Sequence, residues 1–151
     1  MPGLYLEDLK LGDRFQHGSH TITAGEIVEF ARQFDPQAFH LDEKAARRTF
    51  FRGLVASGWH TASIGMRLFV QGSFQPEGGF IGVAVDELRW PRPTRPGDIL
   101  VADSEIVEIS RSASRSDRGR IKVRNTIRNQ RGEVVGSLVA TMIMKRRISV
   151  R

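Results

Sequence analysis

The segment from about Ala56 to Val70 constrains the fold of this chain more than any other. Helical spacing places small and large apolar residues on nearly all of its sides. The small residues are Ala56, Gly58, Ala62 and Gly65, and the large ones are Trp59, Ile64, Met66 and Leu68. The run is too short, and too often interrupted by Ser, Thr and His, to cross a bilayer. We therefore expect a helix that the rest of the chain must enclose.

After Gly78-Gly79 the apolar residues alternate with smaller or polar ones, a pattern that predicts β-strands. The clearest runs are Ile81 to Val85, Ile99 to Ile109, Arg120 to Arg128 and Val134 to Met144, and a more polar run from Asp13 to Thr23 predicts a first strand. Turn signals separate the later runs at Pro96-Gly97-Asp98, Ser110 to Gly119 and Asn129 to Gly132. The expected fold class is α+β, with a curved antiparallel sheet wrapped around the long central helix.

Two more helices are expected in the first half of the chain. Thr23, with Glu26 three residues later, forms a capping box, and apolar residues follow at helical spacing as far as Phe34. Pro36 disfavours helical geometry at the preceding residue, so this helix should stop near Asp35. A short helix should then begin at Asp42, whose carboxylate can cap the next backbone amides.

Composition fits a single domain over residues 1–151, since 40% of the residues are hydrophobic. The absence of cysteine excludes a disulfide framework, a thiolate metal site and a cysteine nucleophile. The N-terminus lacks the basic start and apolar run of a signal peptide, so we expect a cytoplasmic protein.

The formal net charge of +6 indicates an anionic partner. No recognition-helix or RNA-binding signature accompanies it, so nucleic acid is not the expected partner. A phosphorylated small-molecule carrier satisfies the same charge balance. Arg89, Arg92 and Arg95 could contact its phosphates, although a solvated basic loop is the alternative, and residues from Arg111 to Arg124 compete for the role.

Asp35 and His40 lie five residues apart in a segment that we expect to be a loop between two helices. Such a pair can hold one water, with one group accepting its proton and the other supplying or receiving a second, as hydration of a polarised double bond requires. On spacing alone a structural role is favoured instead. In that interpretation Asp35 ends its helix through turn hydrogen bonds and His40 is a half-buried spacer.

The same segment resembles the signature of the MaoC-like dehydratases, a family that includes the R-specific enoyl-CoA hydratases. In that signature an Asp, four intervening residues and a His precede an acidic residue and an alanine-rich helix, here Asp35, His40, Asp42 and Ala45-Ala46. The likeness continues into a glycine-containing helix at residues 54–63 and a Pro-Gly-Asp turn at residues 96–98, so it covers most of the chain. It implies the hot-dog fold, a sheet around a central helix.

The resemblance implies reversible hydration of a 2-enoyl thioester, such as an enoyl-CoA, to the 3-hydroxyacyl thioester, of R configuration. Asp35 and His40 would activate water for attack at the β-carbon, and a proton would be delivered at the α-carbon. Gly58 would offer its backbone N–H to the developing enolate oxygen. Without the resemblance, a packing role for this glycine is equally open.

Two departures from better-known hydratases bear on the acyl group. Those enzymes carry Asn-Pro where this chain has Gln37-Ala38, and His-Gly-Met where it has Ser57-Gly58-Trp59. Gln37, Ser57 and Trp59 are therefore expected to influence substrate preference. Ser63 is a further candidate for contact with the acyl group, although a serine in a small-residue helix more often packs.

No metal and no separate cofactor are expected, because His17, His20 and His40 have no recognisable ligand spacing and coenzyme A enters as part of the substrate. His60 is expected to be a hydrogen-bonded core residue. The expected partners are an acyl-CoA or acyl-carrier thioester and, from the resemblance, another copy of this chain in a homodimer or higher homo-oligomer. Neither nucleic acid nor a membrane is expected.

Two rival functions share the fold. An acyl-CoA thioesterase needs a carboxylate, often on the central helix, and no Asp or Glu occurs between Leu54 and Val70. A non-catalytic acyl-thioester-binding protein would not require the Asp35/His40 pair. Release of a free thiol would identify the first rival, and unchanged turnover in folded variants of the pair would remove both residues from the mechanism.

Overall fold

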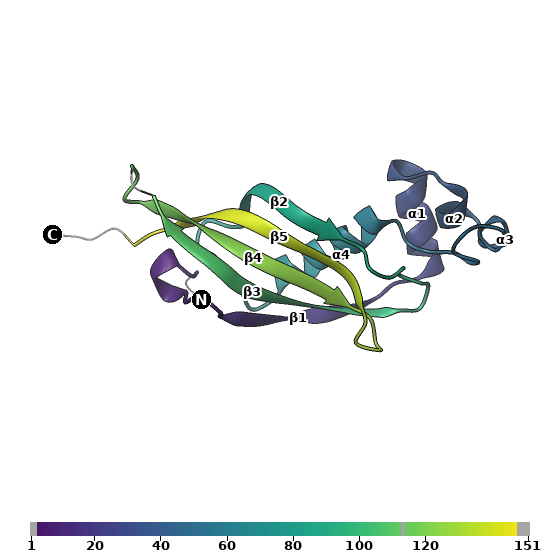
Figure 1. The fold of residues 1–151 in the computed structure, drawn as a ribbon, viewed down its shortest axis with the longest axis horizontal. Helices are drawn as coiled ribbons and strands as arrows, with labels where there is room; N and C mark the ends of the chain where they lie inside the picture. Colours follow the sequence, from purple (N-terminus) through teal and green to yellow (C-terminus); the bar gives the residue numbers. More distant parts are fainter. Residues whose placement is uncertain (1–2, 113, 148–151) are drawn as a thin grey trace.

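The structure is a computed structural model that describes residues 3–112 and 114–147. Within these ranges five strands form one antiparallel sheet in the order β1-β3-β4-β5-β2. The strands are β1 (Arg14–Thr21), β2 (Ile81–Arg89), β3 (Ile99–Arg111), β4 (Arg118–Arg128) and β5 (Val134–Lys145). The helices are η1 (Leu6–Asp8), α1 (Ala24–Phe34), α2 (Ala38–Leu41), α3 (Glu43–Ala46) and α4 (Gly58–Gln71). Figure 1 shows the sheet curving over α4, with α1, α2 and α3 gathered beyond one end of it.

This arrangement confirms the expected α+β class and the sheet wrapped around a central helix. Buried side chains form two clusters along the inner face of the sheet, and α4 contributes to both. Ile64 and Leu68 belong to the cluster nearer α1, whereas Phe69 belongs to the cluster nearer η1. The helix therefore connects the two halves of the core, and the position of its N-terminus is fixed by packing along its whole length.

The central helix begins two residues later than the sequence predicts, at Gly58 instead of Ala56. The Val55 N–H donates to the carbonyl of Phe39 at 3.0 Å and the Ala56 N–H to that of Thr94 at 2.9 Å, so both residues are held outside the helix. Ser57 is the N-cap, and its hydroxyl accepts a hydrogen bond from the Trp59 N–H. Among the described helices, α4 included, none is long and apolar enough to cross a membrane.

The prediction that the rest of the chain encloses this helix on nearly all sides is wrong for one face of the helix. Trp59 and Met66 are 57% and 48% exposed, and Ser63 lies exposed between them, whereas Ile64 and Leu68 on the opposite face are buried. The reason is topological. The single sheet covers α4 from one side, and its edge strand β2 leaves a groove along the helix instead of closing over it.

Both predicted helix starts before α4 are confirmed. The Thr23 hydroxyl accepts a hydrogen bond from the Glu26 N–H at 3.1 Å, and the Glu26 carboxylate accepts one from the Thr23 N–H at 3.3 Å, which completes the capping box of α1. The helix ends at Phe34, with Asp35 as its C-cap. The Asp42 carboxylate accepts a hydrogen bond from the Lys44 N–H at 2.9 Å at the start of α3.

The prediction of a plain loop between these two helices is wrong, because residues 38–41 form the helical turn α2. The backbone is extended at Gln37 and then resumes helical geometry, with the His40 N–H donating to the Gln37 carbonyl at 2.9 Å and the Asp42 N–H to the Ala38 carbonyl at 3.2 Å. Pro36 therefore interrupts the helical path only briefly. His40 consequently projects from a short helix whose geometry is fixed by backbone hydrogen bonds.

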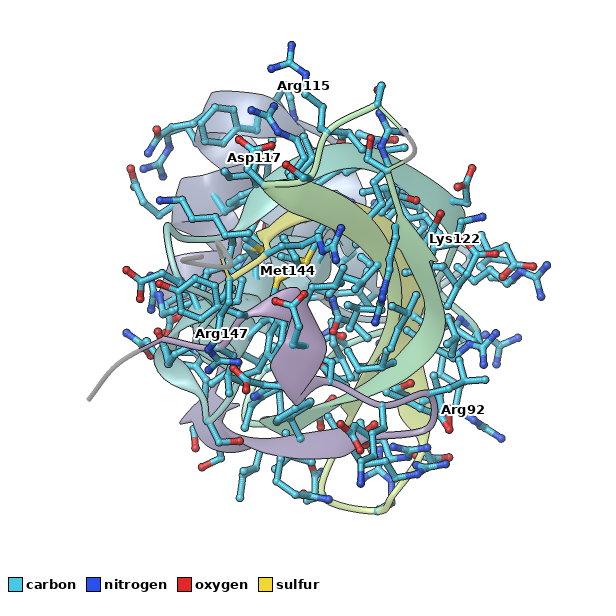
Figure 2. The ribbon with its side chains drawn as sticks, turned by 90° about the vertical axis from the view of Figure 1, so that its left-hand side faces the viewer. Arg92, Arg115, Asp117, Lys122, Met144 and Arg147 are labelled. Carbon is cyan, nitrogen blue, oxygen red and sulfur yellow. The ribbon has the colours of Figure 1, made fainter. Side chains whose placement is uncertain are left out.

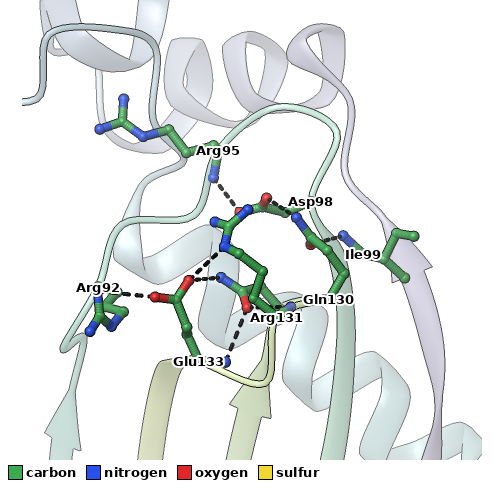
Figure 3. Close-up of polar contacts among 8 residues, drawn as sticks. Arg92, Arg95, Asp98, Ile99, Gln130, Arg131 and Glu133 are labelled. Atoms are coloured by element: carbon green, nitrogen blue, oxygen red, sulfur yellow. Dashed lines mark hydrogen bonds and ion pairs between the residues drawn. The ribbon is translucent and has the colours of Figure 1, made fainter.

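The predicted Pro-Gly-Asp turn is present, and it is joined to the β4–β5 hairpin (Figure 3). Gly97 has a φ of 86°, which favours glycine. The buried Asp98 carboxylate accepts hydrogen bonds from the Arg95 N–H at 2.9 Å and from the Gln130 side chain at 3.0 Å. Because Gln130 lies in the hairpin turn, this contact holds two loops together at the same end of the sheet as α1 to α3.

Candidate active site

The structure brings the predicted acid/base pair together where α1 ends and α2 begins. Asp35 Oδ2 lies 3.2 Å from His40 Nε2. The aspartate side chain is 18% exposed and the histidine side chain 7%, so the pair is largely shielded but the carboxylate retains a path to solvent. A carboxylate and an imidazole at this separation can share a proton directly, and both can contact the same water beside them.

The ring orientation of His40 is fixed by a residue that the sequence did not indicate. Its Nδ1 lies 2.6 Å from the backbone carbonyl oxygen of Val55. A carbonyl can only accept a hydrogen bond, so Nδ1 carries a hydrogen, and Nε2 is the nitrogen that faces Asp35 and can exchange a proton. Val55 lies fifteen residues away in the sequence, and no local pattern marks such a contact.

Asp35 is held as a carboxylate by its neighbours. Burial raises the pKa of Asp35. Hydrogen bonding from the side chains of Gln37 and Ser57, together with His40, lowers that pKa by a larger amount, so the net pKa lies below the ordinary value for an aspartate. The Gln37 amide donates to Asp35 Oδ1 at 2.6 Å. Two of the residues predicted to influence substrate preference, Gln37 and Ser57, thus contact the catalytic candidate itself.

A cavity of about 320 Å³ brings His40 and Gly58 together. Trp90, Arg92 and Phe50 also line it, and its walls combine aromatic and aliphatic side chains with one cationic group. The N-terminus of α4 opens into this space, and the first amides of a helix have no acceptor within the helix itself. The cavity therefore combines an imidazole with backbone donors suited to an oxyanion.

Gly58 is required by packing as well. A Cβ at this position would lie 2.5 Å from Cε2 of Trp90, because the indole lies directly against the helix start. The Trp90 ring also contacts the Trp59 ring edge-to-face, with centroids 5.3 Å apart. The space beside the glycine is thus filled by a side chain of this protein, while its backbone N–H remains at the cavity.

Trp59 and Ser63 lie on the open face of α4 and are not among the residues that line this cavity. The Ser63 hydroxyl donates to the Trp59 carbonyl at 2.7 Å, one helical turn back. The structure therefore separates these two predicted substrate-contacting residues from Asp35 and His40 within one chain.

The candidate phosphate-binding arginines occupy different places. Arg92 lines the cavity, and its guanidinium lies 3.1 Å from the Glu133 carboxylate (Figure 3). Arg95 instead donates to the backbone carbonyl of Phe51 at 2.8 Å and so holds a loop. Arg89 lines a separate cavity of about 180 Å³ with Arg124. Of the three, only Arg92 shares a cavity with His40 among the described residues.

Basic residues also gather at the opposite end of the molecule, which Figure 2 shows with Arg115, Asp117 and Arg147 labelled. Three of these charges are neutralised locally. Arg147 pairs with Asp8 at 2.7 Å, Arg146 with Glu7 at 3.2 Å and Arg118 with Asp117 at 3.3 Å. The connection from β3 to β4 that contains Arg115 is residues 112–117, shorter than the expected segment Ser110 to Gly119 because both strands extend into it; Ala113 lies outside the described residues.

His60 and His17 are placed away from the cavity that contains His40. His60 is buried, as expected, and its ring stacks on Phe30 with centroids 4.6 Å apart, but its Nδ1 has no hydrogen-bond partner in the described part of the chain. Burial lowers the pKa of His60, and that of His17 as well. Across residues 3–112 and 114–147, no group of three or more His, Asp or Glu side chains is arranged to hold a metal ion.

The chain is similar to known proteins over most of its length. The family model for the MaoC-like domain matches residues 9–128. The crystal structure of the MaoC-like dehydratase from Rhodospirillum rubrum superposes with a TM-score of 0.93 at 49% identity, over 97% of this chain and 100% of that one. The (R)-hydratase from A. caviae gives a TM-score of 0.70 at 26% identity, over 90% and 97%. The uncharacterised protein YdeM of Bacillus subtilis is 27% identical over 93% of this chain and 99% of its own length.

Proposed function

The chain belongs to the MaoC-like dehydratase family, and from this premise we propose that it adds water reversibly to a 2-enoyl thioester to give the (R)-3-hydroxyacyl thioester. The observation that carries the proposal is the 3.2 Å contact between Asp35 Oδ2 and His40 Nε2, beside a cavity that also contains the N-terminus of α4. An acid/base pair and an oxyanion site in one place are what such an addition requires.

In the proposed reaction a water molecule binds beside the Asp35/His40 pair, within hydrogen-bonding reach of both groups. The carboxylate, which is ionised at neutral pH, accepts a hydrogen bond from the water, and His40 Nε2 exchanges a proton with it. The oxygen of the water bonds to the β-carbon while the π electrons move toward the carbonyl. A proton then returns to the α-carbon, so that one water is added in total, and elimination follows the same steps in reverse.

The negative charge that develops on the thioester oxygen is met by the Gly58 N–H. The N-terminus of α4 adds the positive end of its helix dipole, in a cavity whose aromatic and aliphatic walls keep the local dielectric low. We assign Gln37 to positioning Asp35, since its amide donates to Asp35 Oδ1, and we assign Ser57 to the same task because it lowers the pKa of that carboxyl. Arg92 is the proposed contact for a carrier phosphate or pantetheine oxygen near the cavity.

We also propose that two chains associate through the edge of β2. This strand has no neighbour on one side within the described sheet, and its Val83 and Val85 are 45% and 56% exposed. Together with Met66 on the open face of α4, they border an apolar groove of about 400 Å³. Antiparallel pairing of β2 with its own copy would continue the sheet and cover the groove. Trp59 and Ser63 could then meet the acyl group from the partner side.

The function is tested by following the loss of enoyl-thioester absorbance across a panel of 2-enoyl-CoA substrates, with the product configuration determined afterwards. Asp35→Asn and His40→Gln should each lower kcat by about 10²- to 10⁴-fold, because each removes a proton-transfer group. Glu108→Gln, at an exposed carboxylate of β3 away from the β2 edge, is the control and should retain activity.

Free thiol is measured in the same reactions. A hydratase leaves the thioester intact, so thiol release that depends on Asp35 would indicate a thioesterase and contradict the proposal. Full turnover in both site variants would remove Asp35 and His40 from the mechanism.

A further inference from the structure

The turn that follows α3 presents an unusual combination of an exposed aromatic ring and positive charge. The sequence here is Arg47-Arg48-Thr49-Phe50-Phe51-Arg52-Gly53. The Phe50 side chain is 91% exposed, whereas the adjacent Phe51 is only partly accessible. An exposed ring of this size offers a flat face on which a planar ligand can stack. The turn lies at the helical end of the molecule, beside α3 (Figure 1).

The exposure of Phe50 is enforced by a turn that is held in place. The Arg95 guanidinium donates to the Phe51 carbonyl at 2.8 Å, and the Arg52 N–H donates to the Thr49 carbonyl at 3.0 Å. Arg52 itself has a φ of 57°, a left-handed conformation that glycine adopts more readily than arginine. Strain of this kind is concentrated where a ligand is clamped. The turn is therefore pre-organised, with Phe50 directed outward.

A continuous line of aromatic contacts joins this turn to the catalytic pair. The ring of Phe50 meets that of Phe51 at 5.3 Å between centroids, Phe51 meets Phe39 at 5.1 Å, and Phe39 meets the His40 ring at 4.5 Å. Phe50 and His40 also line the same cavity. A thioester that extends along this wall from His40 would bring its carrier out past Phe50.

The charges on the turn are available to a ligand. Within the described residues neither Arg48 nor Arg52 lies within 4 Å of a carboxylate, and Arg47 approaches Glu43 only at 3.9 Å. At the other end of the molecule Arg118, Arg146 and Arg147 are, by contrast, paired with Asp117, Glu7 and Asp8. An exposed ring between unpaired guanidinium groups suits a nucleotide, since the base stacks on the ring and the phosphates meet the arginines.

We propose that this turn binds the adenosine 3′-phosphate 5′-diphosphate portion of coenzyme A, with adenine on Phe50 and phosphate oxygens on Arg48 and Arg52. The inference rests on the proposed function, because it places the thioester at His40. It also selects the carrier. An acyl carrier protein presents phosphopantetheine without adenine, so a stacking platform favours acyl-CoA as the substrate.

The test compares 2-butenoyl-CoA with 2-butenoyl-pantetheine, which lacks the nucleotide. Phe50→Ala should raise KM for the CoA thioester by about tenfold, and it should raise KM for the pantetheine thioester far less, because only the CoA thioester carries the adenine. Phe50→Trp retains a stacking surface, so its KM for the CoA thioester should be close to the wild-type value. Leu11→Ala truncates another exposed apolar side chain, on the segment between η1 and β1, and should have no effect.

Binding of adenosine 3′,5′-bisphosphate by calorimetry separates this proposal from the proposed function. The wild type should bind it even if no enoyl thioester is hydrated, and Arg48→Gln and Arg52→Gln should each weaken binding and reduce its dependence on salt. Arg115→Gln, in the β3–β4 segment, should not. An equal rise in KM for both thioesters would show that Phe50 does not act on the nucleotide.

Two other outcomes would overturn the assignment. If adenosine 3′,5′-bisphosphate does not bind while an acyl carrier protein thioester is turned over in preference to the CoA thioester, the turn serves the protein carrier instead. If Phe50→Ala changes the molar mass of the protein in solution, the ring is a contact between chains. Phe50 is exposed, so loss of the fold is not expected to obscure either result.

Discussion

At the scale of single residues, Asp35 links the proposed chemistry to the stability of the protein. Its carboxylate accepts hydrogen bonds from Gln37 and Ser57 and lies against His40, and these contacts hold its pKa below the ordinary value despite the opposing effect of burial. A carboxyl whose pKa is lower in the folded than in the unfolded state stabilises the fold at pH values above its unfolded pKa. That contribution is lost as the pH falls through the folded pKa.

Asp35→Asn should therefore lower the free energy of unfolding at neutral pH, and the difference from wild type should shrink as the solution is acidified. The amide cannot be ionised, so it lacks the pH-dependent contribution. Urea unfolding followed by circular dichroism at a series of pH values measures the difference, with Glu108→Gln as the control on β3. A wild-type advantage that grew toward acid pH would contradict the lowered pKa of Asp35.

Gly58 offers a second test at this scale, because a side chain there would collide with Trp90 at 2.5 Å. Gly58→Ala should destabilise the protein by about 1–3 kcal/mol, as overpacking typically does. In Gly58→Ala/Trp90→Ala the indole is absent, so the added methyl has space and the two effects should not add. Gly18→Ala in β1, where a Cβ would meet nothing within 4 Å, is the control.

The same variants examine the proposed oxyanion role. Alanine retains the backbone N–H, so the double variant should keep the donor at the start of α4 while changing the wall of the cavity. We expect its kcat to exceed that of Gly58→Ala alone. If the single variant is fully active and as stable as the wild type, then Trp90 does not pack against this position as described.

At the scale of elements, the capping box holds α1 and thereby the position of Asp35 at its other end. Thr23→Ala should cost about 1 kcal/mol of stability, because the Glu26 N–H loses its acceptor. Thr23→Ser keeps the hydroxyl and should therefore have the stability of the wild type. Thr21→Ala is the control: it removes the same side-chain atoms two residues earlier, on β1, where the threonine caps no helix. Its free energy of unfolding, measured by chemical denaturation, should stay within about 0.5 kcal/mol of the wild-type value. Equal losses at both threonines would argue against the cap.

Elements with local signals in the sequence were the ones that could be predicted. The Thr23/Glu26 capping box, the cap at Asp42 and the glycine turn at Gly97 depend on residues within a few positions of one another, and each was correct. The turn α2 could not be predicted, because Pro36 and the spacing of polar residues indicate a loop equally well. Local rules identify the ends of helices more securely than they identify a single helical turn.

The candidate site shows the same division. Asp35 and His40 were named from the sequence, and the structure brings them into contact. The Val55 carbonyl and the Trp90 ring were not named from the sequence, because each contacts the site through tertiary packing with a residue fifteen or more positions away. Arg89 and Arg92 are only three positions apart, yet they line different cavities, since β2 ends between them. Sequence spacing could not separate their roles.

At the scale of the whole molecule, the open face of α4 and the free edge of β2 lie on the same side of the fold. Met66, Val83 and Val85 line one groove there, and an apolar surface of this kind next to an unpaired strand is a liability for an isolated chain. Two copies related by a twofold axis would bury both features at once, since antiparallel pairing of β2 with itself brings equivalent residues together.

Val85→Lys tests this association. In a twofold pairing of β2 the introduced charge lies near its own copy and is removed from water, so the variant should sediment as a single chain while the wild type sediments as a pair. Val101→Lys places the same charge on an exposed valine of β3, away from the edge, and should leave the wild-type mass unchanged. Because Trp59 and Ser63 are exposed on the same open face of α4 as Met66, the dissociated variant should also lose affinity for long acyl chains. A wild-type protein that remained a single chain at all concentrations would exclude the pairing and leave the groove open to the acyl group itself.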